Sequence, residues 1–308
     1  MTAAPETVAF IGLGHMGGPM AANLARAGYD VVGYDVVPEA LERAVANGVR
    51  VAEGPTQAVE GASTVITMLP SGRHVLEAYG TADGDGLLAA APAGTLFVDC
   101  STIDVEDART ASDRAVSAGH RGLDAPVSGG VVGAEGGTLT FMVGAPAGDF
   151  AAVRPLLDVM GAKVIHCGST GAGQAAKICN NMILGITMIG VSEAFVLGEK
   201  LGLTHEALFD VSANASGQCW ALTTNCPVPG PVPTSPANRD YQPGFAGALM
   251  AKDLGLALGA IEANGVTAEM GRLASQIYTR YAAGDGARTD FSGIIQEIRA
   301  GSTEGAAQ

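Results

Sequence analysis

The sequence is poor in basic residues, in histidine and in cysteine. Lys and Arg together number 17 against 31 Asp and Glu, which gives a formal net charge of −14. Nucleic-acid binding depends on Lys and Arg neutralising phosphates, so this balance argues against a nucleic-acid partner. The five histidines are scattered, and the five cysteines include no Cys-x-x-Cys pair. We therefore predict no metal site and no disulfide framework, and the cysteine pattern fits a reducing cytoplasm.

Long hydrophobic runs and a secretory signal are also missing from the pattern. The longest apolar stretch, Met182 to Val191, is shorter than the roughly 20 residues needed to span a bilayer. The amino terminus shows no basic segment followed by an apolar run. We therefore expect a cytoplasmic protein with no membrane partner. The 308 residues are 47% apolar and 16% charged, which suffices for two domains with large buried cores.

A glycine-rich segment near the amino terminus indicates a dinucleotide site. Val8–Ile11 is a short apolar run typical of a buried strand, and an alanine-rich helical segment follows Pro19. At such a strand-to-helix turn, Gly12 permits the tight turn, Gly14 lets the backbone approach a pyrophosphate, and Gly17 allows close packing of helix and strand. The helix amino end supplies N–H donors and partial positive charge for the phosphates.

An acidic residue at the end of the next apolar run favours NAD over NADP. Asp35 follows Val31–Tyr34 and lies 21 residues beyond Gly14, where a carboxylate accepts hydrogen bonds from the adenosine ribose. It would repel a 2′-phosphate, and no Arg or Lys occurs between Arg26 and Arg43. The alternative is an ordinary acidic turn residue after a strand.

The order of strand and helix signals predicts two domains. Short β-rich runs alternate with alanine-rich helical segments as far as residue 167, and further runs occur at Val65–Met68, Leu96–Asp99, Leu139–Val143 and Val164–His166. This pattern is typical of an α/β Rossmann-type doubly wound domain, which we place at residues 1–167. Strand signals then nearly vanish, so residues 168–308 are expected to form an all-α domain. It begins with a long apolar helix at about 174–200, and a proline-rich stretch at 227–243 is expected to be an ordered loop.

Two polar loops follow strands of the predicted sheet directly, and a third polar segment follows another short run. They are Met68-Leu69-Pro70, the segment 99–102, and the segment 124–130, in which Ser128, Gly129 and Gly130 offer a hydroxyl and backbone N–H groups to a carboxylate. Each loop alone reads as a common turn. Because ligands bind at the carboxyl ends of strands in open α/β sheets, the loops together outline a cofactor and substrate crevice.

Two of the four lysines occur in apolar helical segments. Gln174, Lys177 and Asn181 share one face of the predicted long helix, which indicates either a cleft holding a polar ligand or a structural hydrogen-bond cluster between helices. Lys252 has uncharged helix-face neighbours, so burial would require a partner such as Asp253 or an anionic ligand. The alternative is a lysine that extends out of an apolar face into solvent.

Several segments together resemble the β-hydroxyacid dehydrogenase family over nearly the whole chain. The shared motifs are residues 12–24, 99–104, 124–130 and 171–181, and the segments 216–220, 227–230 and 244–253 resemble the 3-hydroxyisobutyrate dehydrogenase branch in particular. The resemblance implies a Rossmann domain followed by a helical domain for substrate binding and oligomerisation. It also implies a homodimer or homotetramer that acts on a small anionic hydroxyacid with NAD.

The resemblance also implies roles for individual residues. Lys177 would be the catalytic acid/base, and Ser128, Gly129, Gly130 and Asn181 would bind the substrate. Lys252, Trp220 and Phe245 would line the substrate pocket. The cofactor would be held by Gly12, Leu13, Gly14, His15, Met16, Gly17, Asp35, Met68, Leu69, Pro70 and Thr102, together with Phe245 and Lys252.

The implied reaction is oxidation of 3-hydroxyisobutyrate to methylmalonate semialdehyde, a step of valine catabolism. The alternatives are tartronate semialdehyde reduction or the reaction of another β-hydroxyacid dehydrogenase, using the same lysine and loops. Imine reduction on this fold normally goes with a different residue at position 177. A non-enzymatic alternative is a catalytically silent NAD-binding module, which could lose Lys177 without penalty.

Overall fold

The computed structural model describes residues 6–80, 84 and 86–304. The chain forms two compact units, Met1–Lys177 and Ile178–Gln308. The division therefore falls inside a helix, ten residues after the predicted boundary between residues 167 and 168.

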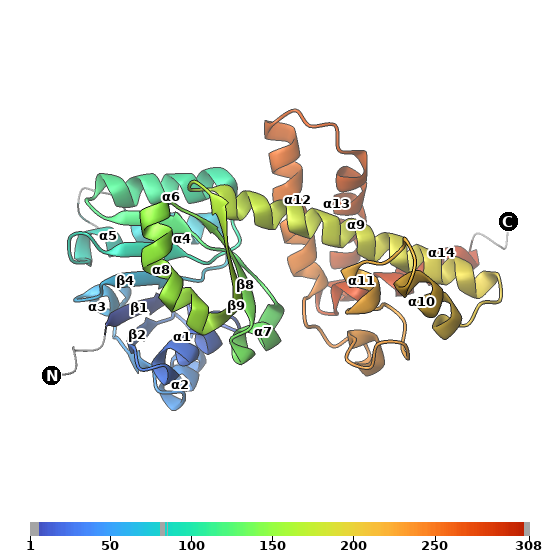
Figure 1. The fold of residues 1–308 in the computed structure, drawn as a ribbon, viewed down its shortest axis with the longest axis horizontal. Helices are drawn as coiled ribbons and strands as arrows, with labels where there is room; N and C mark the ends of the chain where they lie inside the picture. Colours follow the sequence, from blue (N-terminus) through green and yellow to red (C-terminus); the bar gives the residue numbers. More distant parts are fainter. Residues whose placement is uncertain (1–5, 81–83, 85, 305–308) are drawn as a thin grey trace. The chain divides into compact units, whose positions relative to one another are not determined.

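The first unit is built on one nine-stranded sheet (Figure 1). The strands are β1 (Thr7–Ile11), β2 (Asp30–Tyr34), β3 (Arg50–Val51), β4 (Thr64–Thr67), β5 (Leu96–Asp99), β6 (Arg121–Asp124), β7 (Val127–Ser128), β8 (Leu139–Gly144) and β9 (Gly161–Gly168). Their order is β3-β2-β1-β4-β5-β6-β8-β7, with β9 paired to β8. The first six are mutually parallel, whereas β8 runs antiparallel to β6. This is the order of a doubly wound dinucleotide-binding sheet with an added edge.

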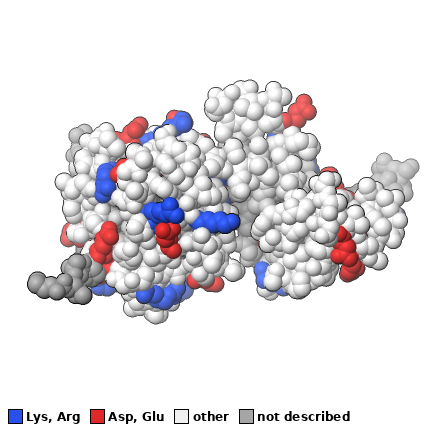
Figure 2. Space-filling model, in the orientation of Figure 1, with Lys and Arg blue, Asp and Glu red and all other residues white. Residues whose placement is uncertain are grey.

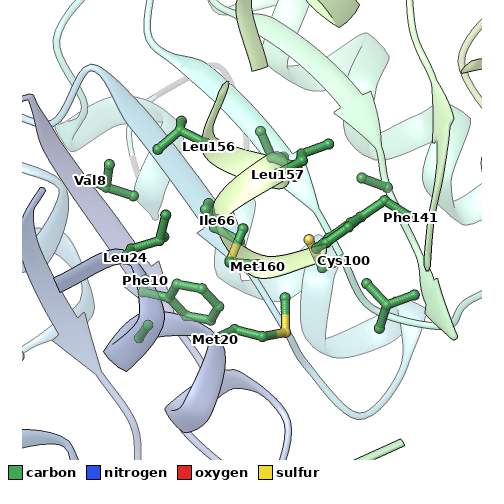
Figure 3. Close-up of a cluster of buried hydrophobic side chains, with 14 of the residues drawn as sticks. Val8, Phe10, Met20, Leu24, Ile66, Cys100, Phe141, Leu156, Leu157 and Met160 are labelled. Carbon is green, nitrogen blue, oxygen red and sulfur yellow. The ribbon is translucent and has the colours of Figure 1, made fainter. Parts of the chain in front are cut away.

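Helices cover both faces of this sheet because successive strand residues point to opposite sides. One face packs on α1 (Gly17–Arg26), α2 (Pro38–Ala46), α7 (Gly130–Gly136) and α8 (Ala147–Met160). The other packs on α3 (Pro55–Val59), α4 (Gly72–Tyr79), α5 (Leu87–Ala90) and α6 (Val105–Ser117). Figure 3 shows the first core, where Phe10 and Ile66 from the sheet meet Met20 and Met160 from helices. The predicted Rossmann-type domain is confirmed.

The second unit is helical. Its elements are the greater part of α9 (Ala172–Lys200), α10 (His205–Ala213), α11 (Trp220–Thr223), α12 (Gly247–Ala263), α13 (Glu269–Ala282) and α14 (Ile294–Glu304), with 3-10 turns η1 (Pro236–Arg239), η2 (Asp285–Ala287) and η3 (Phe291–Gly293). The predicted long helix is therefore present. The proline-rich stretch at 227–243 contains only the turn η1 and is otherwise irregular, as expected from proline chemistry.

Among the described residues, α9 is one helix whose length and apolar composition would allow it to cross a membrane. The run from Met182 to Val191 underestimates its extent, because the apolar character continues along the helix on either side. Half of its most apolar 18-residue window is buried inside the fold. A core helix of a globular protein has these properties, so the finding is weak evidence for a membrane span.

Charged side chains are sparse on the face drawn in Figure 2. Lys and Arg lie scattered there, several of them beside Asp or Glu, with wide areas that carry neither. Two ion pairs of the first unit, Arg121–Asp149 and Arg154–Asp158, each place a basic side chain beside an acidic one.

Candidate active site

The glycine loop joins the end of β1 to the start of α1. Gly12 has φ +95°, and a Cβ there would collide with the carbonyl of Met68. A Cβ on Gly17 would collide with the carbonyl of Gly12. Gly14 is different, because a Cβ there would meet nothing within 4 Å. Gly12 and Gly17 are therefore required by the backbone packing of the protein itself. The backbone at Gly14, in contrast, is exposed and has open space beside it.

Asp35 ties this loop to the neighbouring strand. Its carboxylate accepts hydrogen bonds from the backbone N–H of Leu13 at 2.6 Å and of Val37 at 2.9 Å. The bond to Leu13 was not predictable from the sequence, because it depends on the side-by-side placement of β1 and β2. Asp35 therefore shapes the glycine loop through its own hydrogen bonds, and its bond to a ribose stays a prediction.

The remaining loops of the predicted cofactor site begin at the same sheet edge. The strand ends Ile11, Tyr34, Thr67 and Asp99 are in register. After β4, the N–H of Leu69 donates to Ser101 Oγ at 2.8 Å, and that hydroxyl donates to the buried Asp99 at 2.6 Å. The structure therefore brings together the glycine loop, Asp35, residues 68–70 and Thr102 at one edge.

These features fit a nicotinamide dinucleotide. The open space at Gly14 lies where the loop enters α1, and the amino end of a helix favours a pyrophosphate. Leu13, His15 and Met16 complete the loop, of which Gly14 and His15 are exposed. Within the described residues, no cluster of three or more His, Cys, Asp and Glu side chains suits a metal ion.

The predicted carboxylate-binding segment is more regular than a loop. Ser128 lies on β7, opposite Thr140 of β8, and Gly130 is the first residue of α7. Gly129 and Gly130 have φ of +139° and +63°, which only glycine adopts easily. Ser128 therefore lies in a short strand and not in a loop, because both residues of β7 pair with β8, and its binding of a carboxylate stays a prediction.

The amino-terminal turns of α9 carry three buried polar side chains at helical spacing. Gln174 is fully buried, Lys177 is 6% exposed and Asn181 is 2% exposed. Gln174 Nε2 donates to the carbonyl of Ser101 at 2.7 Å, and its Oε1 accepts from the N–H of Ile103 at 3.2 Å. Gln174 has the structural role that the sequence left open, whereas Lys177 is a buried amine on the same face.

A buried carboxylate holds the start of α9. Asp124, at the end of β6, accepts from the N–H of Gly171 at 2.6 Å and from that of Gln174 at 2.8 Å. Burial raises the pKa of Asp124 to about 6, although these two N–H groups favour its charged form. The sequence pointed to the segment 124–130 but not to this contact.

In the helical unit, Asn181 and Lys252 are linked through Asp253. Asn181 Nδ2 donates to Asp253 Oδ2 at 2.5 Å, and Lys252 Nζ lies 4.0 Å from Asp253 Oδ1. Asp253 is buried, whereas the Lys252 side chain is 34% exposed. The local partner expected for Lys252 is thus present.

The two aromatic residues predicted for the pocket differ in their surroundings. Phe245 packs edge-on against Phe291 at 5.7 Å between ring centroids. The backbone N–H groups of Gly244 and Phe245 both donate to the buried Asp290 at 3.0 Å. Trp220, in contrast, is 52% exposed. The backbone at Phe245 is thus anchored to Asp290 and its ring contacts Phe291, and pocket roles for both Phe245 and Trp220 stay predictions.

Family models match both parts of the chain. Residues 7–168 match the NAD binding domain of 6-phosphogluconate dehydrogenase, and residues 171–298 match a domain described as "NAD-binding of NADP-dependent 3-hydroxyisobutyrate dehydrogenase". The two matches adjoin at the start of α9.

Individual proteins agree with these models. A probable 3-hydroxyisobutyrate dehydrogenase of Mycobacterium tuberculosis is 54% identical, with 96% of this chain and 98% of that protein covered. An NAD-dependent L-serine dehydrogenase of Pseudomonas aeruginosa is 46% identical, with 95% and 97% covered. The human mitochondrial 3-hydroxyisobutyrate dehydrogenase is 44% identical, with 96% and 88% covered.

A solved structure shows the same fold. The M. tuberculosis 3-hydroxyisobutyrate dehydrogenase, described with L-serine, superposes with a TM-score of 0.91 at 54% identity, covering 96% of this chain and 99% of that one. An NAD-dependent oxidoreductase on a Rossmann-type domain with a helical carboxy-terminal domain follows from these matches. The chain belongs to the 3-hydroxyisobutyrate dehydrogenase family.

Proposed function

We propose that the protein oxidises 3-hydroxyisobutyrate to methylmalonate semialdehyde with NAD⁺, with Lys177 as the acid/base. The observation that carries the role of Lys177 is a buried amine one helical turn from the buried amide of Asn181. When bound, NAD⁺ would supply the acceptor for a hydride from C3 of the substrate. The product aldehyde retains the carboxylate, and the hydroxyl proton goes to Lys177 Nζ.

Burial equips Lys177 for this role. Taking an ammonium out of water disfavours its charged form, so the neutral amine needed as a base is easier to reach. In the reverse direction the protonated amine donates to the aldehyde oxygen. Alcohol oxidation is therefore expected to strengthen toward alkaline pH, and aldehyde reduction to weaken. Removal of one positioned acid/base costs about 10²- to 10⁴-fold in rate.

The remaining predicted residues hold the two ligands in this proposal. Ser128 and the N–H groups of Gly129 and Gly130 would bind the substrate carboxylate, and Asn181 its hydroxyl. Lys252, Trp220 and Phe245 would surround C2. NAD would lie on residues 12–17, against Met68, Leu69, Pro70 and Thr102, with its ribose on Asp35.

L-serine is the second candidate substrate. It shares the carboxylate and the primary alcohol of 3-hydroxyisobutyrate but carries an ammonium where the latter carries a methyl group. The names of one relative and one solved structure favour it. The Asp253 carboxylate next to Asn181 is a group that would stabilise an ammonium, whereas Phe245 favours a methyl group.

A substrate panel distinguishes these candidates. We expect kcat/KM with NAD⁺ to be at least about tenfold higher for 3-hydroxyisobutyrate than for L-serine or glycerate, since one methyl contact is worth about 1–3 kcal/mol. The measurement is the initial rate of NADH formation with each acid. A higher value for L-serine would establish the second candidate, and a higher value for glycerate would favour tartronate semialdehyde reduction.

The cofactor preference depends on Asp35 in this proposal. We expect Asp35→Asn to lower the ratio of kcat/KM with NAD⁺ to that with NADP⁺ by at least about tenfold, because it removes a charge facing the 2′ position. Asn keeps an oxygen to accept from Leu13. Glu39→Gln is the matched control, since Glu39 is exposed on α2 and has a smaller expected effect. An unchanged ratio of kcat/KM with NAD⁺ to kcat/KM with NADP⁺ in Asp35→Asn would contradict the assignment of Asp35 to the ribose site.

The proposal also covers the roles of the two domains, the location of the protein in the cell and its number of subunits. Residues 1–167 would bind the cofactor, and residues 168–308 would bind substrate and mediate oligomerisation. We propose a cytoplasmic homodimer or homotetramer that acts in valine catabolism. Sedimentation of the purified protein would give the subunit number.

A further inference from the structure

We propose that Asp124 and Gln174 are positioning residues that fix Lys177 against the sheet edge carrying the cofactor loops. The proposal rests on Lys177 being the acid/base. All residues in the argument belong to the first unit, Met1–Lys177. Neither side chain is assigned contact with substrate or cofactor.

Asp124 supplies the cap that α9 lacks in its own sequence. The residue before α9 is Gly171, which has no side chain to accept from the first free N–H groups of the helix. The carboxylate of Asp124, at the end of β6, takes the place of the missing capping side chain by accepting from the N–H groups of Gly171 and Gln174. The carboxylate is 1% exposed, so its charge is stabilised mainly by these bonds and the positive end of a 29-residue helix.

Small residues allow this close approach. A Cβ on Gly173 would lie 2.7 Å from Asp124 Oδ2 and would also collide with the carbonyl of Met142. A Cβ on Gly144 would lie 2.8 Å from the N–H nitrogen of Gly173. The helix start therefore packs backbone to backbone on β8, which leaves little freedom for it to shift.

Gln174 fixes the same helix to the neighbouring loop. Its amide bonds to the backbone on both sides of Thr102, accepting from Ile103 and donating to Ser101. Thr102 is the residue predicted to lie against the cofactor. Lys177 follows Gln174 by three residues on the same helix face. The Gln174 amide thus determines the position of Lys177 along the helix axis relative to the loop that carries Thr102.

The principal test is Gln174→Met, which keeps the side-chain volume and removes both hydrogen bonds. We expect kcat for 3-hydroxyisobutyrate oxidation to fall about 10- to 100-fold, since a displacement of about 1 Å of a catalytic group has effects of this size. KM and the Kd for NADH should stay within about threefold. Asp124→Ala should behave in the same way, and Asp124→Asn, which keeps one acceptor, should recover part of the rate. Assays at about pH 8 keep Asp124 ionised.

Ser112→Ala is the matched control. Ser112 is buried in the same unit and donates to the carbonyl of Gly122 at 2.9 Å, without a bond to α9. It should lower the urea midpoint and leave kcat unchanged. If Gln174→Met does not fold, Gln174→Glu serves instead, since it keeps the acceptor for Ile103 and loses the donor to Ser101.

The outcomes separate this proposal from the proposed function. A kcat within twofold of wild type in the folded Gln174 and Asp124 variants, with Lys177→Ala inactive, would overturn the positioning role alone. An active Lys177→Ala would overturn the function on which it rests. A fall in kcat for Gln174→Met with Ser112→Ala unchanged supports the proposal.

Discussion

Lys177→Ala is expected to lower kcat for hydroxyacid oxidation by about 10²- to 10⁴-fold, the usual cost of removing one positioned acid/base. The Kd for NADH should stay within about threefold, because the glycine loop, Asp35 and residues 68–70 are held by bonds that do not involve Lys177. The measurements are steady-state NADH formation and a fluorescence titration of NADH.

Two further variants make this result specific. Lys177→Arg keeps the positive charge but introduces a guanidinium that does not give up its proton, so its kcat should also be low. Lys163→Ala is the matched control, because Lys163 lies exposed on β9 of the same unit. A near-normal kcat in Lys177→Ala with NADH binding intact would exclude Lys177 as the acid/base.

The strands of the first unit were predictable where their composition is strongly apolar. β1, β2, β4, β5, β8 and β9 each contain an apolar run that the sequence marks directly. β6 reads Arg-Gly-Leu-Asp, and β3 and β7 have two residues each. These three take strand conformation because neighbouring strands offer hydrogen bonds, which is a tertiary effect that local composition does not record.

The polar residues that hold the site were harder to predict than those expected to touch ligands. Glycine spacing and a lysine on an apolar helix are visible within a few residues. The contacts of Asp124 with Gly171 and of Gln174 with Ser101 join positions 47 and 73 residues apart. The pairing of Asn181 with Asp253 spans 72 residues. Such pairs become visible only when the fold brings the elements together.

Substitutions at two of the loop glycines, Gly14 and Gly17, should separate effects on stability from effects on cofactor binding. Gly17→Ala places a Cβ against the backbone carbonyl of Gly12, which cannot move aside as a flexible side chain would. We expect it to lower the free energy of unfolding by about 3 kcal/mol, the upper end of overpacking effects. Gly14→Ala meets no atom of the chain within 4 Å and has a backbone conformation outside the left-handed region. Its stability should stay within about 1 kcal/mol of wild type.

Gly14→Ala should nevertheless weaken NADH binding by at least about tenfold, because the added methyl group lies where the backbone approaches the pyrophosphate. Urea denaturation gives the stability of each variant, and an NADH titration gives the affinity. Gly148→Ala serves as the matched control, since Gly148 likewise has open space around it and a backbone outside the left-handed region, and is assigned no contact with the cofactor. Normal NADH affinity in a stable Gly14→Ala variant would contradict the assignment of the pyrophosphate to this loop. Reduced affinity without loss of stability in Gly14→Ala, together with loss of stability in Gly17→Ala, would mean that Gly14 serves the cofactor and Gly17 serves the fold.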